Sequence, residues 1–343
     1  MRKYLIIGAG GTGGALGAYL MRGGLDVTFI ARGEHLEAMR RNGLQVIRPR
    51  DSFTLKPVKA FTMQEYSEKM GWNTNGTAEG HAEHANDISE DQAEHANDIS
   101  EGHAEHPDVI FVCVKGYSLD ALYPFLRMAA GKDTVIIPIL NIYGTGAVMQ
   151  KEIPGVLVTD GCIYVASQRL KPGVILMSGD ILRVVFGVRR QEEYRAVLTE
   201  IAKDLALCGI GGGLSENIQL DALMKYSYVS AQGACGLFFN VSAGEIQKEG
   251  PCRDFYRELV HEIDLLAQAQ GIHFTEDIVK RNLKILDSLS PDMTTSLQKD
   301  IAAGKSSEID GLIFEVVRNA RRLKVDVPAY EKVASKLSES LNR

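Results

Sequence analysis

The chain has 343 residues, of which 45% are hydrophobic and 24% are charged, so it is an ordinary globular sequence long enough for two domains. No apolar run approaches the roughly 20 residues that span a bilayer, and no basic cluster is dense enough to indicate nucleic-acid binding. The five cysteines are scattered and form no C-x-x-C pair, which argues against a disulfide frame or metal site and for a cytoplasmic location.

The net charge of −6 comes from one segment of the chain. Residues 71–107 hold nine acidic residues and no Lys or Arg, so the remainder carries a net charge of +3. A mildly basic body suits small anionic ligands.

The strongest pattern lies at the start of the chain. An apolar run, Lys3–Ile7, is followed by Gly8, Ala9, Gly10, Gly11, Thr12 and Gly13, then by helical spacing over about residues 14–21 and a second apolar run, Asp26–Ile30. Strand, glycine turn, helix and strand form the context in which G-x-G-x-x-G predicts dinucleotide binding. Gly8 permits the tight turn, Gly10 lets the backbone approach a pyrophosphate, and Gly13 lets helix and strand pack closely.

The end of the second strand indicates which dinucleotide is bound. An NAD site usually has an acidic side chain there, but here Ala31 and Arg32 follow the strand and no carboxylate occurs before Glu34. A guanidinium suits a 2′-phosphate, so the sequence predicts NADPH or NADP⁺ as the cofactor. The alternative is that Arg32 is a solvated loop residue.

A tandem repeat interrupts the chain after a predicted helix at 34–41 and predicted strands at 44–47 and 53–61. Residues 80–90 and 91–101 are near-copies of one acidic, histidine-rich unit, and a partial third copy ends at His106. With almost nothing apolar to bury, the repeat predicts a mobile surface insertion at about 71–107. A metal-binding helix presenting His81 with His84 is the less favoured alternative.

Polar residues follow the next two predicted strands. The apolar run 108–114 ends at Lys115, helical spacing follows over 118–128, and the strand 134–140 ends at Asn141. Ligands of open α/β sheets lie beyond the carboxyl ends of the strands, so Lys115 and Asn141 are candidates for contacting cofactor and substrate. Taken singly, each could equally be a loop residue or a helix cap.

The rest of the chain changes from mixed to helical. Strands are predicted at 156–166 and 173–186, the latter broken at Gly179-Asp180, and a helix at 192–207. Helices are then predicted at 216–231, 255–269, 277–286, 309–323 and 330–341. The predicted fold is therefore α/β, with a Rossmann-type doubly wound parallel sheet in an NADP-binding domain (1–213), followed by an all-helical substrate or catalytic domain (214–343).

Several of these segments resemble one family, ketopantoate reductase (2-dehydropantoate 2-reductase). The similar segments are the glycine turn with Arg32, Val112–Lys115, Pro138–Gly144, Gly161–Ser167 with Pro172-Gly173, Asp221–Tyr226, and Ser296 to Asp300 followed by Glu308-Ile309-Asp310. The likeness covers nearly the whole chain except the repeat, and the C-terminal pair of motifs is its most specific part.

The resemblance implies NADPH-dependent reduction of 2-dehydropantoate to pantoate, with a role for each matching residue. Lys225 would be the general acid that protonates the substrate carbonyl oxygen. Glu308 would accept hydrogen bonds from substrate or ribose across the cleft, and Ser296 would hydrogen-bond the substrate. Asn141 and Lys115 would position substrate and nicotinamide.

Each assignment in the helical half has a structural alternative. Lys225 could extend along the surface of its helix into water, Glu308 could be only a first-turn acid, and Ser296 only an N-cap. The chain also departs from the family, with Val229 and Gly233 where some members carry asparagine, and Ile142 where glycine is common. These departures put the identity of the oxo acid in doubt more than the type of reaction.

Two other functions stay open at the level of sequence. One is a related NADP-dependent 2-oxo or hydroxy acid dehydrogenase of other specificity. The other is a non-catalytic NADP(H)-binding sensor, which would have no need of Lys225, Ser296 and Glu308 together. A homodimer is compatible with the sequence, which does not fix the oligomeric state.

Overall fold

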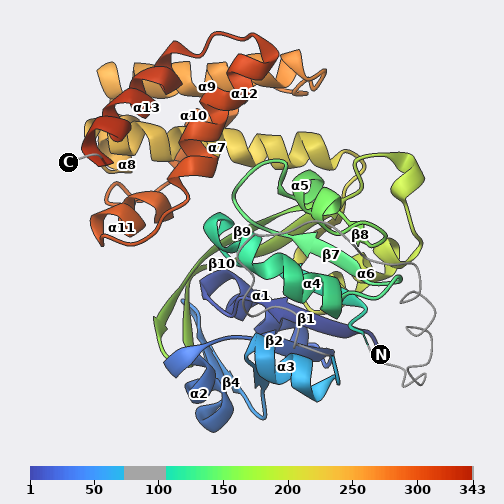
Figure 1. Cartoon of the computed structure of the whole chain (residues 1–343). Coiled ribbons are helices and arrows are strands. Elements are labelled where there is room, and N and C mark those ends of the chain that lie inside the picture. The colour runs from blue at the N-terminus through green and yellow to red at the C-terminus, as the bar shows by residue number, and fades with distance from the viewer. Residues whose placement is uncertain (73–105, 342–343) are drawn as a thin grey trace, which may run out of the picture.

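The computed structural model describes residues 1–72 and 106–341. Its first sheet has six parallel strands in the order β5-β2-β1-β6-β7-β8 (Figure 1). The strands are β1 (Lys3–Ile7), β2 (Asp26–Ile30), β5 (Lys59–Phe61), β6 (Val109–Val112), β7 (Val135–Pro138) and β8 (Leu157–Val158). The chain order reverses between β1 and β6, which is where a doubly wound sheet binds its ligand. The predicted Rossmann-type sheet is thus confirmed.

Both faces of this sheet are buried, which explains why its strands are continuous apolar runs. Side chains alternate along β1, so Tyr4 and Ile6 join one core while Leu5 and Ile7 join another. On the Leu5 side lie α4 (Tyr123–Ala129) and α5 (Thr145–Glu152), and at the sheet edge lies α3 (Met63–Lys69). On the Tyr4 side lies α1 (Gly11–Arg22), beside α2 (Gly33–Asn42).

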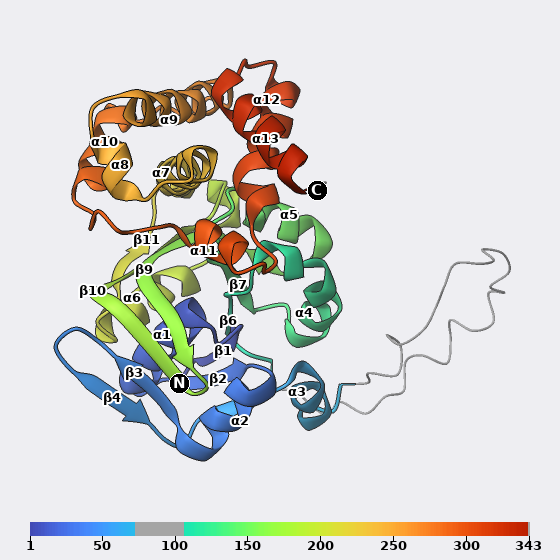
Figure 2. The same ribbon diagram turned by 90° about the vertical axis from the view of Figure 1, so that its left-hand side faces the viewer.

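A second sheet, not expected from the sequence, covers the outer side of α1 (Figure 2). It consists of β3 (Leu44–Ile47), β4 (Ser52–Leu55), β9 (Asp160–Lys171), β10 (Val174–Gly187) and β11 (Gly211–Leu214), and β9 and β10 form a long antiparallel hairpin. Helix α1 lies between the sheets, since a Cβ on Gly17 would meet Phe29 of β2 at 2.3 Å and one on Gly14 would meet Ile175 of β10 at 2.7 Å.

Several predicted elements need correction. The predicted strand 156–166 is two strands, β8 and β9, which belong to different sheets. The predicted strand 53–61 is two strands, because Pro57 has no N–H for the ladder, and β4 and β5 join different sheets. The predicted helix 118–128 begins as two 3₁₀ turns, and α4 starts only at Tyr123, where Pro124 suits a first turn. The predicted break at Gly179-Asp180 is a shift of pairing register within a continuous β10.

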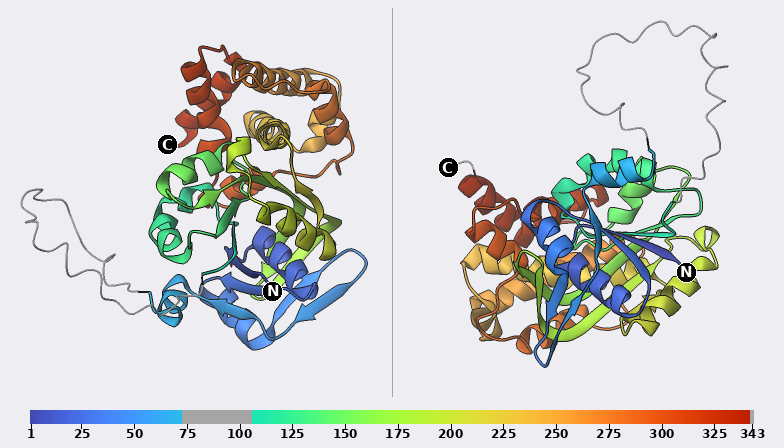
Figure 3. Two further views of the ribbon diagram at one scale, coloured as in Figure 1. Left: turned by 90° about the vertical axis from the view of Figure 1, so that its right-hand side faces the viewer. Right: turned by 90° about the horizontal axis from the view of Figure 1, so that it is seen from below.

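Helix α6 (Val197–Leu207) and strand β11 complete the α/β part, and the described chain after β11 is helical. The helices are α7 (Ile218–Phe239), α8 (Ala243–Gln247), α9 (Pro251–Ala269), α10 (Ile278–Asp287), α11 (Ser296–Ala302), α12 (Glu315–Leu323) and α13 (Pro328–Leu341), with a π-helical turn at Asp310–Phe314. They share a core around Tyr256 and Tyr330 and gather beyond one end of the α/β part (Figure 3). The predicted all-helical C-terminal domain is confirmed, while its predicted boundary after residue 213, inside β11, stays a prediction.

The ends of the predicted insertion meet on the body of the protein. The rings of Trp72 and His106 stack with centroids 5.8 Å apart, and His106 Nδ1 lies 3.1 Å from the carbonyl oxygen of Ala129. The repeat, apart from its last residue His106, lies outside the described part of the chain. Within the described residues, no helix is long and apolar enough to cross a membrane.

Candidate active site

The glycine turn after β1 has the geometry that dinucleotide binding requires. Gly8 has φ +95°, a value that favours glycine, and a Cβ on Gly13 would lie 2.1 Å from the Gly8 carbonyl oxygen. These two glycines therefore let α1 start directly against the strand. A Cβ on Gly10 would meet nothing within 4 Å, so the backbone there is open to a ligand at the N-terminus of α1. The turn thus fits a bound diphosphate.

The β9–β10 hairpin forms a second wall beside this turn. A Cβ on Gly11 would lie 2.7 Å from the Ser167 carbonyl oxygen and 2.8 Å from Gln168 Cα. Gly11 is therefore needed for close packing against β9, whereas Gly10 leaves space. This contact could not be predicted from local sequence patterns, because it joins segments more than 150 residues apart.

Arg32 lies just beyond the carboxyl end of β2, immediately before α2, and its side chain is exposed. The neighbouring Ala31 N–H donates to the Phe61 carbonyl at 2.9 Å, which holds the strand end beside β5. No carboxylate lies at this strand end. The positive charge of Arg32 is therefore the charge expected at a site for a 2′-phosphate.

Lys225 and Asn141 meet across the two parts of the protein. Asn141 follows β7, Lys225 projects from α7, and Lys225 Nζ donates to Asn141 Oδ1 at 2.7 Å. Lys225 is only 9% exposed, so it is not a solvated surface lysine. Burial lowers the pKa of Lys225, with the negative charge of Glu308 acting in the opposite direction.

Lys115 and Glu308 form a second contact between the two parts. Lys115 Nζ lies 3.1 Å from Glu308 Oε2 and 3.1 Å from Asp300 Oδ2, and the Gly116 N–H donates to Glu308 Oε1 at 3.3 Å. Glu308 is 5% exposed, so it is more than a solvated first-turn acid. Burial lowers the pKa of Lys115, but the carboxylates of Glu308 and Asp300 outweigh this effect and raise it overall.

The pKa values of Lys225 and Lys115 are thus shifted in opposite directions. The pKa of Lys225 is lowered beside a neutral amide, and the pKa of Lys115 is raised between two carboxylates. Divergent pKa values in neighbouring groups are typical of acid–base sites. This arrangement makes Lys225 the better proton donor and Lys115 a permanent positive charge.

Lys225, Asn141, Lys115 and Glu308 are joined by hydrogen bonds, but in the described part of the chain Ser296 forms none with these four residues. It is exposed in the first turn of α11, and the helix cap is Thr295, whose hydroxyl accepts from the Gln298 N–H at 3.2 Å. Helix α11 packs on α7, where a Cβ on Gly233 would meet Leu297 at 3.2 Å. Ser296 therefore lies on the helix beside the Lys225 helix, and its role stays a prediction.

Two residues near this site had no assigned role from the sequence. Asp300 ends the Ser296 to Asp300 segment that resembles the family. Its contact with Lys115 joins positions 185 residues apart and is visible only in the structure. Tyr164 of β9 places its ring centroid 5.8 Å from Lys225 Nζ, close enough for a cation–π contact. Burial raises the pKa of Tyr164 well above that of a free tyrosine, so its hydroxyl stays protonated.

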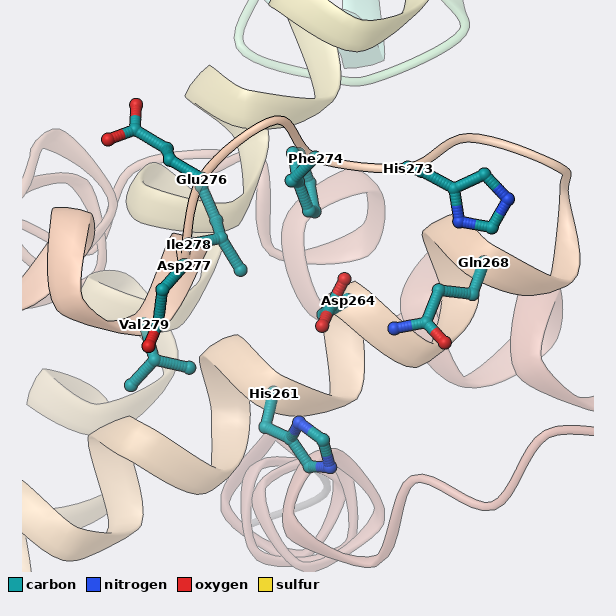
Figure 4. A pocket seen from close by; sticks show the side chains of 9 residues that line it. All are labelled: His261, Asp264, Gln268, His273, Phe274, Glu276, Asp277, Ile278 and Val279. Carbon is teal, nitrogen blue, oxygen red and sulfur yellow. The ribbon is translucent and has the colours of Figure 1, made fainter.

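A separate pocket of about 430 Å³ lies in the helical domain, between the end of α9 and the start of α10 (Figure 4). Its lining residues are His261, Asp264, Gln268, His273, Phe274, Glu276, Asp277, Ile278 and Val279. Lys225, Asn141 and Glu308 do not line it, so it is distinct from the site described above. Among the residues described, no group of three or more His, Cys, Asp or Glu could hold a metal ion.

The glycine turn lies at the switch point of a parallel sheet, and a buried lysine from the helical domain contacts Asn141, which follows another strand of the same sheet. These features define a two-domain class with a nucleotide-binding sheet. The family described as "Ketopantoate reductase PanE/ApbA" matches residues 4–191, and "Ketopantoate reductase PanE/ApbA C terminal" matches residues 217–340. The chain belongs to the ketopantoate reductase family and is an oxidoreductase of that family.

Individual relatives share the full length of the chain at low identity. An uncharacterized oxidoreductase of Bacillus subtilis, YkpB, is 25% identical, with 98% of this chain and 97% of the relative covered. The solved 2-dehydropantoate 2-reductase of Geobacter metallireducens has a TM-score of 0.81 at 20% identity, with 98% and 99% covered. A solved D-mandelate dehydrogenase with NADH and anilino(oxo)acetate has a TM-score of 0.77 at 19% identity, with 100% of both chains covered. The two solved structures support the fold.

Proposed function

We propose that the protein reduces 2-dehydropantoate to pantoate with NADPH, as a step of pantothenate and coenzyme A biosynthesis in the cytoplasm. The observation that carries the proposal is the buried Lys225, which lies against the neutral Asn141 with a lowered pKa. A lysine in this state can give up a proton more readily than a free lysine. The family assignment and five free cysteines in the described chain support the reaction class and the compartment.

Bound NADPH supplies the hydride that reaches C2 of the substrate. As that C–H bond forms, the electron pair of the carbonyl moves to oxygen, and the developing alkoxide takes a proton from Lys225 Nζ. The N–H bond breaks, the O–H bond forms, and neutral Lys225 regains its proton from solvent. Asn141, which accepts from Lys225 at 2.7 Å, orients the ammonium toward the carbonyl.

The remaining predicted residues hold the reactants. The backbone of Gly8, Ala9, Gly10, Gly11, Thr12 and Gly13 would hold the diphosphate, with Arg32 on the 2′-phosphate. Glu308 would accept hydrogen bonds from substrate or ribose and Ser296 would bind the substrate. Lys115, kept charged between Glu308 and Asp300, would position substrate and nicotinamide. For the assembly we propose a homodimer, and sedimentation of the purified protein would test this.

One observation favours a second substrate class. Val229 lies one turn after Lys225 on the same face of α7, and the Tyr164 ring lies 5.8 Å from Lys225 Nζ. An apolar and an aromatic side chain here would suit an oxo acid with a large apolar or aromatic substituent, such as benzoylformate. The D-mandelate dehydrogenase neighbour has the same fold.

The test is a spectrophotometric screen of NADPH and NADH oxidation with purified protein across a panel of 2-oxo acids. The proposal expects the highest kcat/KM with 2-dehydropantoate and NADPH. Preference for benzoylformate would establish the second class instead. NADPH binding without turnover on any oxo acid would support the non-catalytic sensor and contradict both reductase functions.

A further inference from the structure

His35 joins two segments of the nucleotide-binding part through its ring nitrogens. It lies in α2 and is 4% exposed. Its Nε2 is 2.7 Å from the Ala9 carbonyl oxygen, and its Nδ1 accepts from the Gly173 N–H at 2.9 Å. Because a backbone N–H can only donate, Nδ1 carries no proton, so Nε2 of the neutral ring donates to Ala9.

Both partners belong to walls of the predicted diphosphate site. Ala9 lies in the glycine turn, and Gly173 lies in the turn between β9 and β10. The same hairpin packs against the turn at Gly11. His35 therefore ties the glycine turn to the hairpin that covers it.

The bond to Ala9 matters because of the peptide that it restrains. The Ala9 carbonyl and the Gly10 N–H belong to one planar trans peptide and point in opposite directions, so holding the oxygen fixes where the N–H points. Glycine at positions 10 and 11 leaves this segment with much conformational freedom. Without a partner for the Ala9 oxygen, the peptide could rotate and change the direction of the Gly10 N–H at the start of α1.

We infer that His35 is a positioning residue for the dinucleotide, which holds the Ala9–Gly10 peptide in the orientation that presents the Gly10 N–H to the diphosphate. This inference rests on the proposed use of a nicotinamide dinucleotide. The neutral ring is required, because a protonated Nδ1 would point its hydrogen at the Gly173 N–H.

The surroundings of His35 favour this neutral ring. Burial lowers the pKa of His35, the hydrogen bond to Ala9 acts in the opposite direction, and the positive charge of Arg169 on β9 lowers it further. Dinucleotide affinity should therefore be complete at neutral pH and should weaken as pH falls below 6.5 toward the folded pKa.

Two substitutions separate the hydrogen bonds of the ring. In His35→Gln the side-chain amide reaches the position of Nε2 and keeps a donor for Ala9. In His35→Asn the shorter amide reaches the position of Nδ1, so Gly173 keeps an acceptor and Ala9 loses its donor. We expect His35→Asn to raise the Kd and the KM for NADPH about five- to tenfold and to change kcat by no more than about twofold. In His35→Gln, the Kd, KM and kcat should each stay within about twofold of wild type.

The measurements are fluorescence titration with NADPH, steady-state kinetics with the best oxo acid, and thermal unfolding without ligand. The pH profile of Kd adds a second readout, since wild type should lose affinity in acid more steeply than His35→Gln, which does not titrate. The 2′-phosphate titrates equally in both proteins, so the difference isolates His35.

If both variants bind NADPH as wild type does and differ from it only in unfolding temperature, His35 is purely structural and the inference is wrong. Equal loss of affinity in both variants would also overturn it. A wild-type chain that binds neither NADPH nor NADH would overturn the proposed function, and the inference with it.

Discussion

Lys115 and Lys225 bear the same functional group in different surroundings. Lys115 Nζ lies 3.1 Å from each of two carboxylates, while Lys225 Nζ donates to the amide of Asn141 at 2.7 Å. An ammonium between carboxylates keeps its proton, and a buried ammonium beside a neutral amide is more ready to lose it. In the proposed reaction, the retained positive charge and the proton donor would thus belong to two different residues.

Replacing Lys225 tests the proton donor. We expect Lys225→Ala to lower kcat about 10²- to 10⁴-fold, because the alkoxide loses its acid, while the Kd for NADPH changes little. A large loss of turnover, together with an unchanged fluorescence enhancement of NADPH on binding, would show this. Lys203→Ala, at an exposed position of α6, is the matched control and should behave as wild type. Unchanged turnover in Lys225→Ala would remove the acid role.

The pH dependence of turnover follows from the lowered pKa of Lys225. Reduction needs the protonated form, so kcat should fall as pH rises through a value below the 10.5 of a free lysine. Oxidation of the hydroxy acid needs the neutral form and should rise over the same range. Lys115 titrates above 10.5 and should not contribute there. A flat profile for kcat up to pH 10.5 would contradict the assignment.

Replacing Arg32 tests the choice of cofactor. We expect Arg32→Ala to raise the KM for NADPH about tenfold or more and to leave the KM for NADH unchanged, because only NADPH carries the 2′-phosphate. Arg41→Ala, at the other end of the same helix, is the control. Equal effects on both cofactors would mean that Arg32 does not contact the phosphate.

At the scale of elements, two adjacent glycines at the start of α1 have different surroundings. Gly10 faces open space, and Gly11 faces the backbone of β9. The same substitution at adjacent positions should therefore have unrelated effects, one on ligand binding and one on packing.

We expect Gly10→Ala to fold normally, since φ −67° is ordinary for alanine and its methyl would meet no atom within 4 Å, yet to weaken NADPH binding more than about tenfold by occupying the diphosphate space. Gly11→Ala should lower the free energy of unfolding by about 1–3 kcal/mol, because its methyl would overlap Ser167 and Gln168. Thermal unfolding and NADPH titration of both variants distinguish the two effects. If both variants lost the same stability and the same NADPH affinity, these two predictions would be wrong.

The elements that the sequence predicted well are those specified by their own residues. β1 and β2 follow directly from two apolar runs around a glycine turn, and their observed bounds match the prediction. The second sheet depends on pairing between β3 and β10, whose partners Val46 and Ile175 lie far apart in the chain. Local patterns cannot specify such a partner, so β3, β9 and β10 were predicted as strands without their sheet.

The candidate site divides in the same way. Lys115 and Asn141 could be proposed because strand ends meet at one edge of a parallel sheet, whereas the position of Lys225 opposite Asn141 rested on the family resemblance. His35 could not be recognised, because one histidine within a predicted amphipathic helix has no signal that separates a buried hydrogen-bonding ring from an exposed one.

At the scale of the whole molecule, the α/β part and the helical domain contact one another through the side chains of the proposed chemistry. Asn141 bonds Lys225, and Lys115 bonds Glu308 and Asp300. The groups of the proposed site therefore come from both parts, and neither part alone holds all of them. Separate expression of residues 1–213 or 214–343 should accordingly give no oxo acid reduction.

The stack of Trp72 on His106 has a consequence for how the chain can change in length. Because these rings hold the entry and exit of the intervening segment together, the body of the protein meets the same junction whatever number of eleven-residue units lies between them. Changing the length of a segment between fixed ends alters its closure free energy by less than ~1 kcal/mol. Deleting residues 80–90 should therefore leave the unfolding temperature, kcat and KM as in the full chain.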